Sequence, residues 1–154
     1  MNLNPAHVHL LLNHLPMIIL LVGIGQFAWA VWRNNVTLQK ASLWIFIVSA
    51  LVTIPTYMTG DGAEHVVENM PGVTEALIHA HEDAALYSLI GVLVLGLLSA
   101  FILWSKRQAT DWSGGGIYAA LVLSIVVFSL LGYTANQGGQ IVHQEVRPAF
   151  QVVE

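Results

Sequence analysis

Residues 84–104 of the chain read AALYSLIGVLVLGLLSAFILW, without a single Asp, Glu, Lys, Arg or His. A helix of about 17–25 residues is enough to cross the hydrocarbon core of a bilayer. That core holds no water to bond the backbone, so a helix, which satisfies its own amide and carbonyl groups, is the expected form. Three further uncharged apolar runs predict three more spans: Leu15–Trp32, Ala41–Met58 and Ile117–Tyr133.

The composition of the whole chain agrees with a membrane protein. Of its 154 residues, 56% are apolar and 9% are charged, against about 25% charged residues in a soluble domain. Barrel strands would alternate over about 10 residues, and these runs do not alternate. We therefore predict an all-α integral membrane four-helix bundle. It forms a single membrane domain over residues 1–154, with spans at 15–33, 41–59, 82–105 and 116–136.

The chain contains no cysteine. This excludes disulfides, thiolate metal ligands, iron–sulfur clusters and the covalent attachment of c-type haem. The formal net charge of -4 offers no basic patch, so nucleic acid is not an expected partner. The first residues carry no basic segment, and we therefore expect no cleaved signal peptide.

The basic residues are distributed unequally between the two sides of the predicted membrane. Four of the five basic residues lie in the two connections that follow the first and third apolar runs: Arg33, Lys40, Lys106 and Arg107. Short loops rich in Lys and Arg stay on the cytoplasmic side. We therefore expect both termini to be periplasmic and the chain to be a multi-pass protein of a bacterial inner membrane.

Several local signals predict where helices begin, bend and end. Asn4-Pro5 is typical of a helix start, and Pro16 predicts a kink near His14 because proline removes a backbone donor. Thr74-Glu75 is an N-cap followed by a first-turn acid, so the third helix should begin well before its apolar run. Gly138-Gly139 is typical of a helix stop, which would end the fourth helix near residue 136.

All seven histidines lie on the predicted periplasmic side. The spans alternate in direction, so each of the four helices brings a histidine to the same end of the bundle. A single interfacial histidine is usually only a polar residue at headgroup level, but seven at one end point to a metal or haem site. The candidate cofactor ligands are His9, His14, His65, His79, His81 and His143. For a metal ion, the candidates are His9, His14, His81 and His143.

Helix geometry adds a prediction about the number of cofactors. On a straight helix, His9 and His14 point roughly 140° apart, and His79 and His81 roughly 200° apart. Each of these two helices can therefore offer imidazoles in two directions. We accordingly predict one or two cofactors near this surface.

The string His9-Leu-Leu-Leu-Asn-His14-Leu-Pro16 resembles the H-P-x-x-x-H-x-P signature of a widespread family of small bacterial four-span membrane proteins of unassigned function. The sequence departs from the signature at Leu10, where the family usually has Pro. Members of that family are often linked to cytochrome c modules, which implies membrane electron transfer. Further similarities are Gly60 with Asp61, a histidine before the third helix (His79 or His81), and the pair Gly138, Gly139.

These observations favour a b-type cytochrome-like electron-transfer subunit with one or two bis-histidine haems at the periplasmic end. Its expected partners are the lipid bilayer and a periplasmic cytochrome c or other redox subunits, and quinone is a further candidate cofactor. Such a subunit belongs in a larger redox complex more than it acts as a stand-alone enzyme. The alternatives are a non-haem metal protein and a non-catalytic anchor of a respiratory or photosynthetic complex. A transporter ranks lower, because ion pathways place ionisable groups within the spans.

Overall fold

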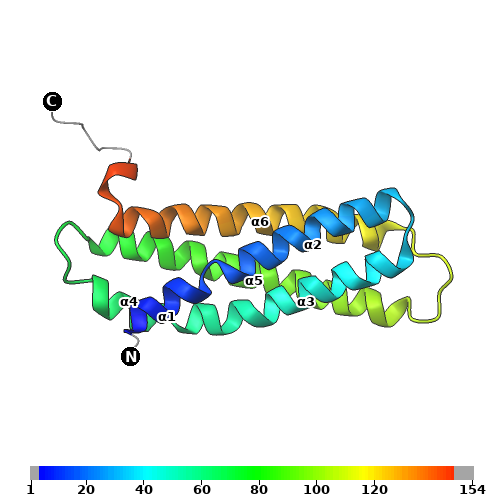
Figure 1. Cartoon of the computed structure of the whole chain (residues 1–154), viewed down its shortest axis with the longest axis horizontal. Coiled ribbons are helices and arrows are strands. Elements are labelled where there is room, and N and C mark those ends of the chain that lie inside the picture. The colour runs from blue at the N-terminus through cyan, green and yellow to red at the C-terminus, as the bar shows by residue number, and fades with distance from the viewer. Residues whose placement is uncertain (1–3, 148–154) are drawn as a thin grey trace.

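The computed structural model of the chain describes residues 4–147 and is all-α, with no β-strand in that range. Its four long helices form an antiparallel bundle (Figure 1): α2 (Leu15–Trp32), α3 (Val36–Met58), α5 (Glu75–Ser105) and α6 (Gly115–Val142). Three short elements gather at one end of it: α1 (Pro5–Leu12), α4 (Gly60–Val67) and the 3-10 helix η1 (Gln144–Val146).

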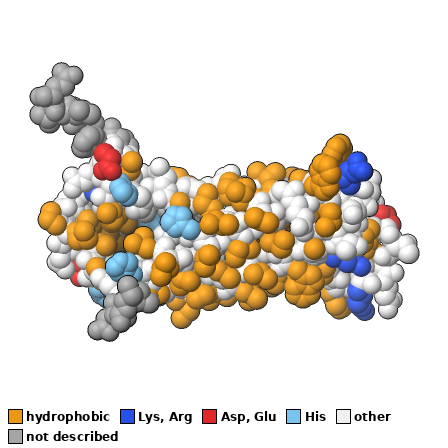
Figure 2. All heavy atoms as spheres, in the orientation of Figure 1, with side chains coloured by type: hydrophobic (Ala, Val, Ile, Leu, Met, Phe, Trp, Pro, Cys, Tyr) orange, Lys and Arg blue, Asp and Glu red, His pale blue; other side chains and the backbone are white. Residues whose placement is uncertain are grey.

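The long helices pack in a closed ring, and each is suited to a membrane. Helix α3 lies between α2 and α5, α5 packs against α6, and α2 contacts α6. All four are long and apolar enough to cross a bilayer. Figure 2 shows apolar side chains covering the visible face between the two ends, with Lys and Arg at one end and His at the other. The predicted all-α four-helix bundle is confirmed.

Small residues allow the helices to approach closely inside the bundle. A Cβ added to Gly96 of α5 would lie 2.7 Å from the Cβ of Ala50 on α3. Buried serines, such as Ser49 and Ser99, occupy similar contact positions. The larger core side chains fill the space that remains, as in the edge-to-face pair of Phe27 and Phe46, whose ring centroids are 5.4 Å apart. Small residues at interfaces are the usual basis of helix packing in lipid, where no hydrophobic force drives helices together.

The predicted helix starts and the kink are confirmed. The side chain of Asn4 accepts from the amide of Ala6 at 2.9 Å, and Thr74 caps α5 by accepting from the amide of Leu77. The chain breaks between α1 and α2 at residues 13–14, directly before Pro16. Proline cannot bond the carbonyl four residues back. The hydroxyl of Thr56 on α3 lies 3.4 Å from that carbonyl oxygen, while it donates at 2.9 Å to the Val52 carbonyl of its own helix.

The predicted stop of the fourth helix is wrong. Helix α6 continues through Gly138 and Gly139 and ends at Val142. Glycine is tolerated in a helix interior at a modest cost, and here tertiary packing outweighs it, because the ring of His81 lies against Gly138. The structure also places a helix in the connection between the second and third spans, where none was expected. This helix, α4, follows Thr59 directly.

Candidate functional site

Two histidines from distant parts of the chain meet at the end of the bundle that carries the short helices. His9 lies on α1 and His81 in the second turn of α5. Their ring centroids are 6.4 Å apart and the ring planes stand at 87°. Both residues are partly buried, unlike most of the other histidines. This pair is the core of the candidate site.

The ring of His81 is held by helix α6. Its Nδ1 lies 3.0 Å from the carbonyl oxygen of Thr134. A carbonyl can only accept, so Nδ1 carries the proton and donates it. The neighbouring hydroxyls form a chain that supports this turn: Ser88 lies 2.9 Å from Thr134 Oγ1, which in turn donates to the Leu130 carbonyl. The Cε1 side of the ring packs on Gly138, where an added Cβ would come within 2.9 Å of His81 Cε1.

The ring of His9 is held by the junction of α3 and α4. Its Nδ1 lies 3.0 Å from Thr59 Oγ1. The single hydroxyl proton of Thr59 is already donated to the carbonyl of Thr56 at 2.7 Å. The Thr59 oxygen must therefore accept from His9, whose Nδ1 carries the proton.

Both imidazoles thus have the same protonation pattern in their neutral form. The proton sits on Nδ1, which leaves the lone pair of each Nε2 free, and no hydrogen-bond partner of either Nε2 is found within residues 4–147. Metal-binding histidines usually donate their other N–H to a carbonyl or similar acceptor, which fixes the tautomer and the ring orientation. A metal bound by two imidazole nitrogens at about 2.0–2.1 Å places the ring centres roughly 6 Å apart. The donor chemistry and the spacing of His9 and His81 fit such a pair.

The other predicted ligands do not join this pair. His14 is exposed at the break before α2. His65, His79 and His143 are exposed as well, and each faces a carboxylate from its own stretch of chain. The partners are Glu68 at 3.8 Å, Glu82 at 3.1 Å and Glu145 at 3.0 Å. Their assignment as ligands stays a prediction.

The number of donors separates two kinds of metal site. Among the described residues, no group of three or more His, Cys, Asp or Glu side chains is placed to hold a metal ion. A zinc ion in a protein usually takes three or four protein ligands. A haem needs only one or two axial ligands, because the macrocycle supplies the other four nitrogens. The described residues therefore bring two histidines together, with no third ligand placed beside them.

An unpaired polar atom lies near the pair. Asn13 follows His9 by four residues and ends α1. Its Oδ1 is buried and has no hydrogen-bond partner within the described part of the chain. A buried acceptor without a donor costs about 1–3 kcal/mol. The amide of Asn13 is thus available to a donor group bound at this end of the bundle.

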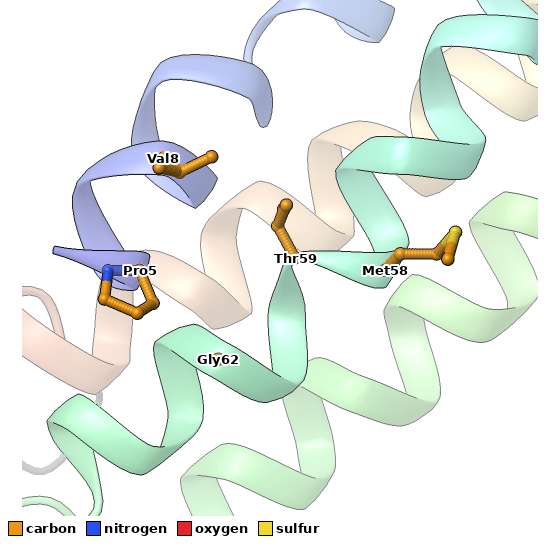
Figure 3. Close-up of a pocket in the computed structure, with 5 residues that line it drawn as sticks. All are labelled: Pro5, Val8, Met58, Thr59 and Gly62. Atoms are coloured by element: carbon orange, nitrogen blue, oxygen red, sulfur yellow. The ribbon is translucent and has the colours of Figure 1, made fainter. Parts of the chain in front are cut away.

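A pocket adjoins the partner of His9. Figure 3 shows its lining residues on α1 and at the junction of α3 with α4. The pocket has a volume of about 350 Å³. Its lining is mostly apolar. Thr59, which accepts from His9, is one of the lining residues. The lining residues are Pro5, Val8, Met58, Thr59 and Gly62.

Sequence reasoning did not identify the residues that position the two rings. Thr59 and Thr134 act through a hydroxyl and a backbone carbonyl, and neither stands at a recognisable spacing from its histidine. Ser88 carries a weak signal, since it follows His81 by seven residues and therefore shares its helix face. The sequence predicts a helix stop at Gly138, whereas in the structure this glycine makes room for a ring.

The chain belongs to the family described as "Predicted membrane protein (DUF2231)", which matches residues 5–146. This match confirms the resemblance to a family of small four-span membrane proteins. With its four apolar helices, the chain is a multi-pass membrane protein that lies in a lipid bilayer. No curated protein and no solved structure matches the chain significantly.

Proposed function

We propose that this member of the DUF2231 family binds one b-type haem between His9 and His81 and transfers electrons at the periplasmic face of a bacterial inner membrane. The observation that carries the proposal is the close pair of imidazoles, whose centroids are 6.4 Å apart and whose planes stand at 87°. Both rings are anchored through Nδ1, as axial ligands usually are. A bound haem would supply one-electron exchange between ferrous and ferric iron.

The residues of the chain have three tasks in this proposal. His9 and His81 provide the two nitrogen donors. Thr59 and the Thr134 carbonyl hold the rings in the ligating tautomer. Gly138 leaves the space that the His81 ring occupies. The proposal is for a single haem, because no second pair of adjacent histidine rings is found within residues 4–147.

The apolar pocket beside Thr59 is the proposed site of exchange with the quinone pool. Its lining suits a lipophilic ring, and Thr59, one of the lining residues, also accepts from His9. Electrons would leave through a periplasmic cytochrome c or another redox subunit. The four spans carry no histidine toward the basic end, so the chain would relay electrons along one surface rather than across the bilayer.

The deciding experiment is an optical spectrum of the purified protein after expression with added haem precursor. We expect b-type bands in the reduced-minus-oxidised spectrum and a stoichiometry near one haem per chain. His9→Ala and His81→Ala should each lose the bands, whereas His65→Ala, at an exposed position on α4, should keep them. Absence of haem from the unmodified protein, or equal loss in His65→Ala, would contradict the proposal.

The quinone step has its own test. Val8→Trp fills the pocket without replacing either histidine. We expect it to keep the haem spectrum and to slow reduction by a soluble quinol analogue. The matched control is Val48→Trp, at an exposed position on α3 outside the pocket lining. Equal reduction rates in the two variants would contradict the quinone site but not the proposed haem site.

A further inference from the structure

A second cavity lies at the opposite, basic end of the bundle. It has a volume of about 260 Å³ and sits between the turn that joins α2 to α3 and the loop that joins α5 to α6. Its floor is formed by Gln39 and Trp112, each 3% exposed. Its rim includes Asn34, Asp111 and Ser113, which are exposed. A single water takes about 30 Å³ in the liquid, so the cavity has room for a larger polar group.

The floor of the cavity contains an unsatisfied acceptor. The side-chain amide of Gln39 points its Nε2 toward the Ala30 carbonyl at 3.5 Å. In this orientation the donor of the amide, and not its oxygen, lies toward the carbonyl. Gln39 Oε1 is then left buried and without a donor in the described part of the chain. It lacks an N–H or O–H group that a ligand could bring.

The rim of the cavity contains a charged acceptor. Asp111 accepts from the Ser113 amide at 2.8 Å and from the Ser113 hydroxyl at 2.9 Å. These hydrogen bonds lower the pKa of Asp111 from its ordinary value, so the side chain is a carboxylate at neutral pH. Two acceptors, one of them an anion, favour a cationic group with N–H donors.

Two lysines lie beside the cavity, one bonded to the loop and one over the Trp112 ring. Lys106 Nζ donates to the carbonyls of Asp111 at 3.0 Å and Ser113 at 2.8 Å, which ties the loop to the end of α5. Lys40 stands one residue after Gln39, with its Nζ 4.8 Å from the centre of the Trp112 ring. No carboxylate within residues 4–147 pairs with Lys40. An anionic group can therefore bind beside the cavity.

The aromatic residues at this end place the cavity at the level of lipid headgroups. Trp29, Trp32 and Trp104 are more than half exposed, and Arg33 and Arg107 lie over their rings. Tryptophans of this kind mark the interface between bilayer and water. A molecule that carries a phosphate and a protonated amine is abundant at that depth in the form of a phospholipid.

We propose that this cavity binds the headgroup of a phospholipid with a primary ammonium group, phosphatidylethanolamine in chemical class. The ammonium enters between Gln39 and Asp111, and the phosphate lies against Lys40. Phosphatidylcholine has the same net charge, but its trimethylated nitrogen has no N–H to donate. The site therefore selects by hydrogen bonding and not by charge alone.

The test is lipid binding to the delipidated protein in detergent, followed by native mass spectrometry. The lipids are phosphatidylethanolamine, phosphatidylcholine and phosphatidylglycerol with identical acyl chains. We expect phosphatidylethanolamine to bind at least about tenfold more tightly than the other two, as one charge-assisted hydrogen bond of about 1.4 kcal/mol would give. The water-soluble glycerophosphoethanolamine should bind much more weakly, because it lacks the chains that hold it at the membrane.

Three variants connect the preference to this cavity. Gln39→Leu and Asp111→Asn should each reduce the preference for phosphatidylethanolamine. Because Asp111 is exposed, its replacement is expected to fold, which keeps the test valid if Gln39→Leu does not fold. The matched control is Gln137→Leu, near the other end of the bundle, which should keep the preference. Equal binding of ethanolamine and choline lipids overturns the proposal, as does a preference that survives Asp111→Asn. Equal binding of the water-soluble headgroup overturns the assignment to a lipid.

Discussion

The ring of His81 lies against the backbone of Gly138, so closely that a Cβ on Gly138 would come within 2.9 Å of Cε1 and 3.1 Å of Nδ1 of the ring. The glycine belongs to the last turns of α6 and the histidine to the first turns of α5. The contact therefore joins the two helices at the end of the bundle where His9 meets His81.

Gly138→Ala should displace the His81 ring and reduce haem content. The neighbouring Gly139 is the matched control, because an added Cβ there meets nothing within 4 Å. Both changes replace glycine by alanine in the same helix turn, so they share any effect on helix propensity. The measurement is haem per chain by pyridine haemochrome assay. Equal haem content in the two variants would show that the ring does not need this space.

Thr59→Val should weaken haem binding by about 10–100-fold, the usual loss when the hydrogen-bond partner of a ligating histidine is removed. The change keeps the shape of the side chain but removes the oxygen that accepts from His9 Nδ1. Thr59→Ser retains that oxygen and should restore binding. Haem titration of the apoprotein measures the effect. If the valine and serine variants bind alike, the hydroxyl has no part in positioning His9.

Gly96→Ala should destabilise the bundle by about 1–3 kcal/mol, the usual cost of overpacking a close contact. The added methyl group would meet Ala50 of α3 at 2.7 Å. Gly25→Ala on α2 meets nothing within 4 Å and should be neutral or stabilising by up to about 1 kcal/mol. Unfolding by SDS in mixed micelles compares the two. A Gly96→Ala protein as stable as the unmodified one would place α3 and α5 farther apart.

Single cysteines should report the orientation of the chain, since the sequence has none of its own. Asn69→Cys lies beyond α4 at the histidine end, and Ala109→Cys lies in the basic loop between α5 and α6. Basic loops remain cytoplasmic, so a membrane-impermeant maleimide should label position 69 in intact spheroplasts and position 109 only after permeabilisation. The reverse pattern would place the proposed haem on the cytoplasmic face.

Much of the fold could be predicted from local properties of the chain. The uncharged run at 84–104 and its three counterparts predict helices because lipid excludes charge and leaves the backbone only its own hydrogen bonds. Capping residues such as Asn4 and Thr74 predicted where helices start, and Pro16 predicted the break. The stop assigned to Gly138-Gly139 was wrong, because glycine also serves where a ring from another helix needs the space of a side chain.

The sequence by itself determined that the chain has four apolar helices and that its histidines lie at one end of them. Only the tertiary structure decided that His9, and not His14, meets His81. The break at residues 13–14 lets α1 lie along α4 while His14 stays exposed. The anchors of the two rings, Thr59 and the Thr134 carbonyl, come from other helices. Hydropathy is a property of each segment alone, whereas ring pairing depends on how each helix is rotated and how closely its neighbours pack.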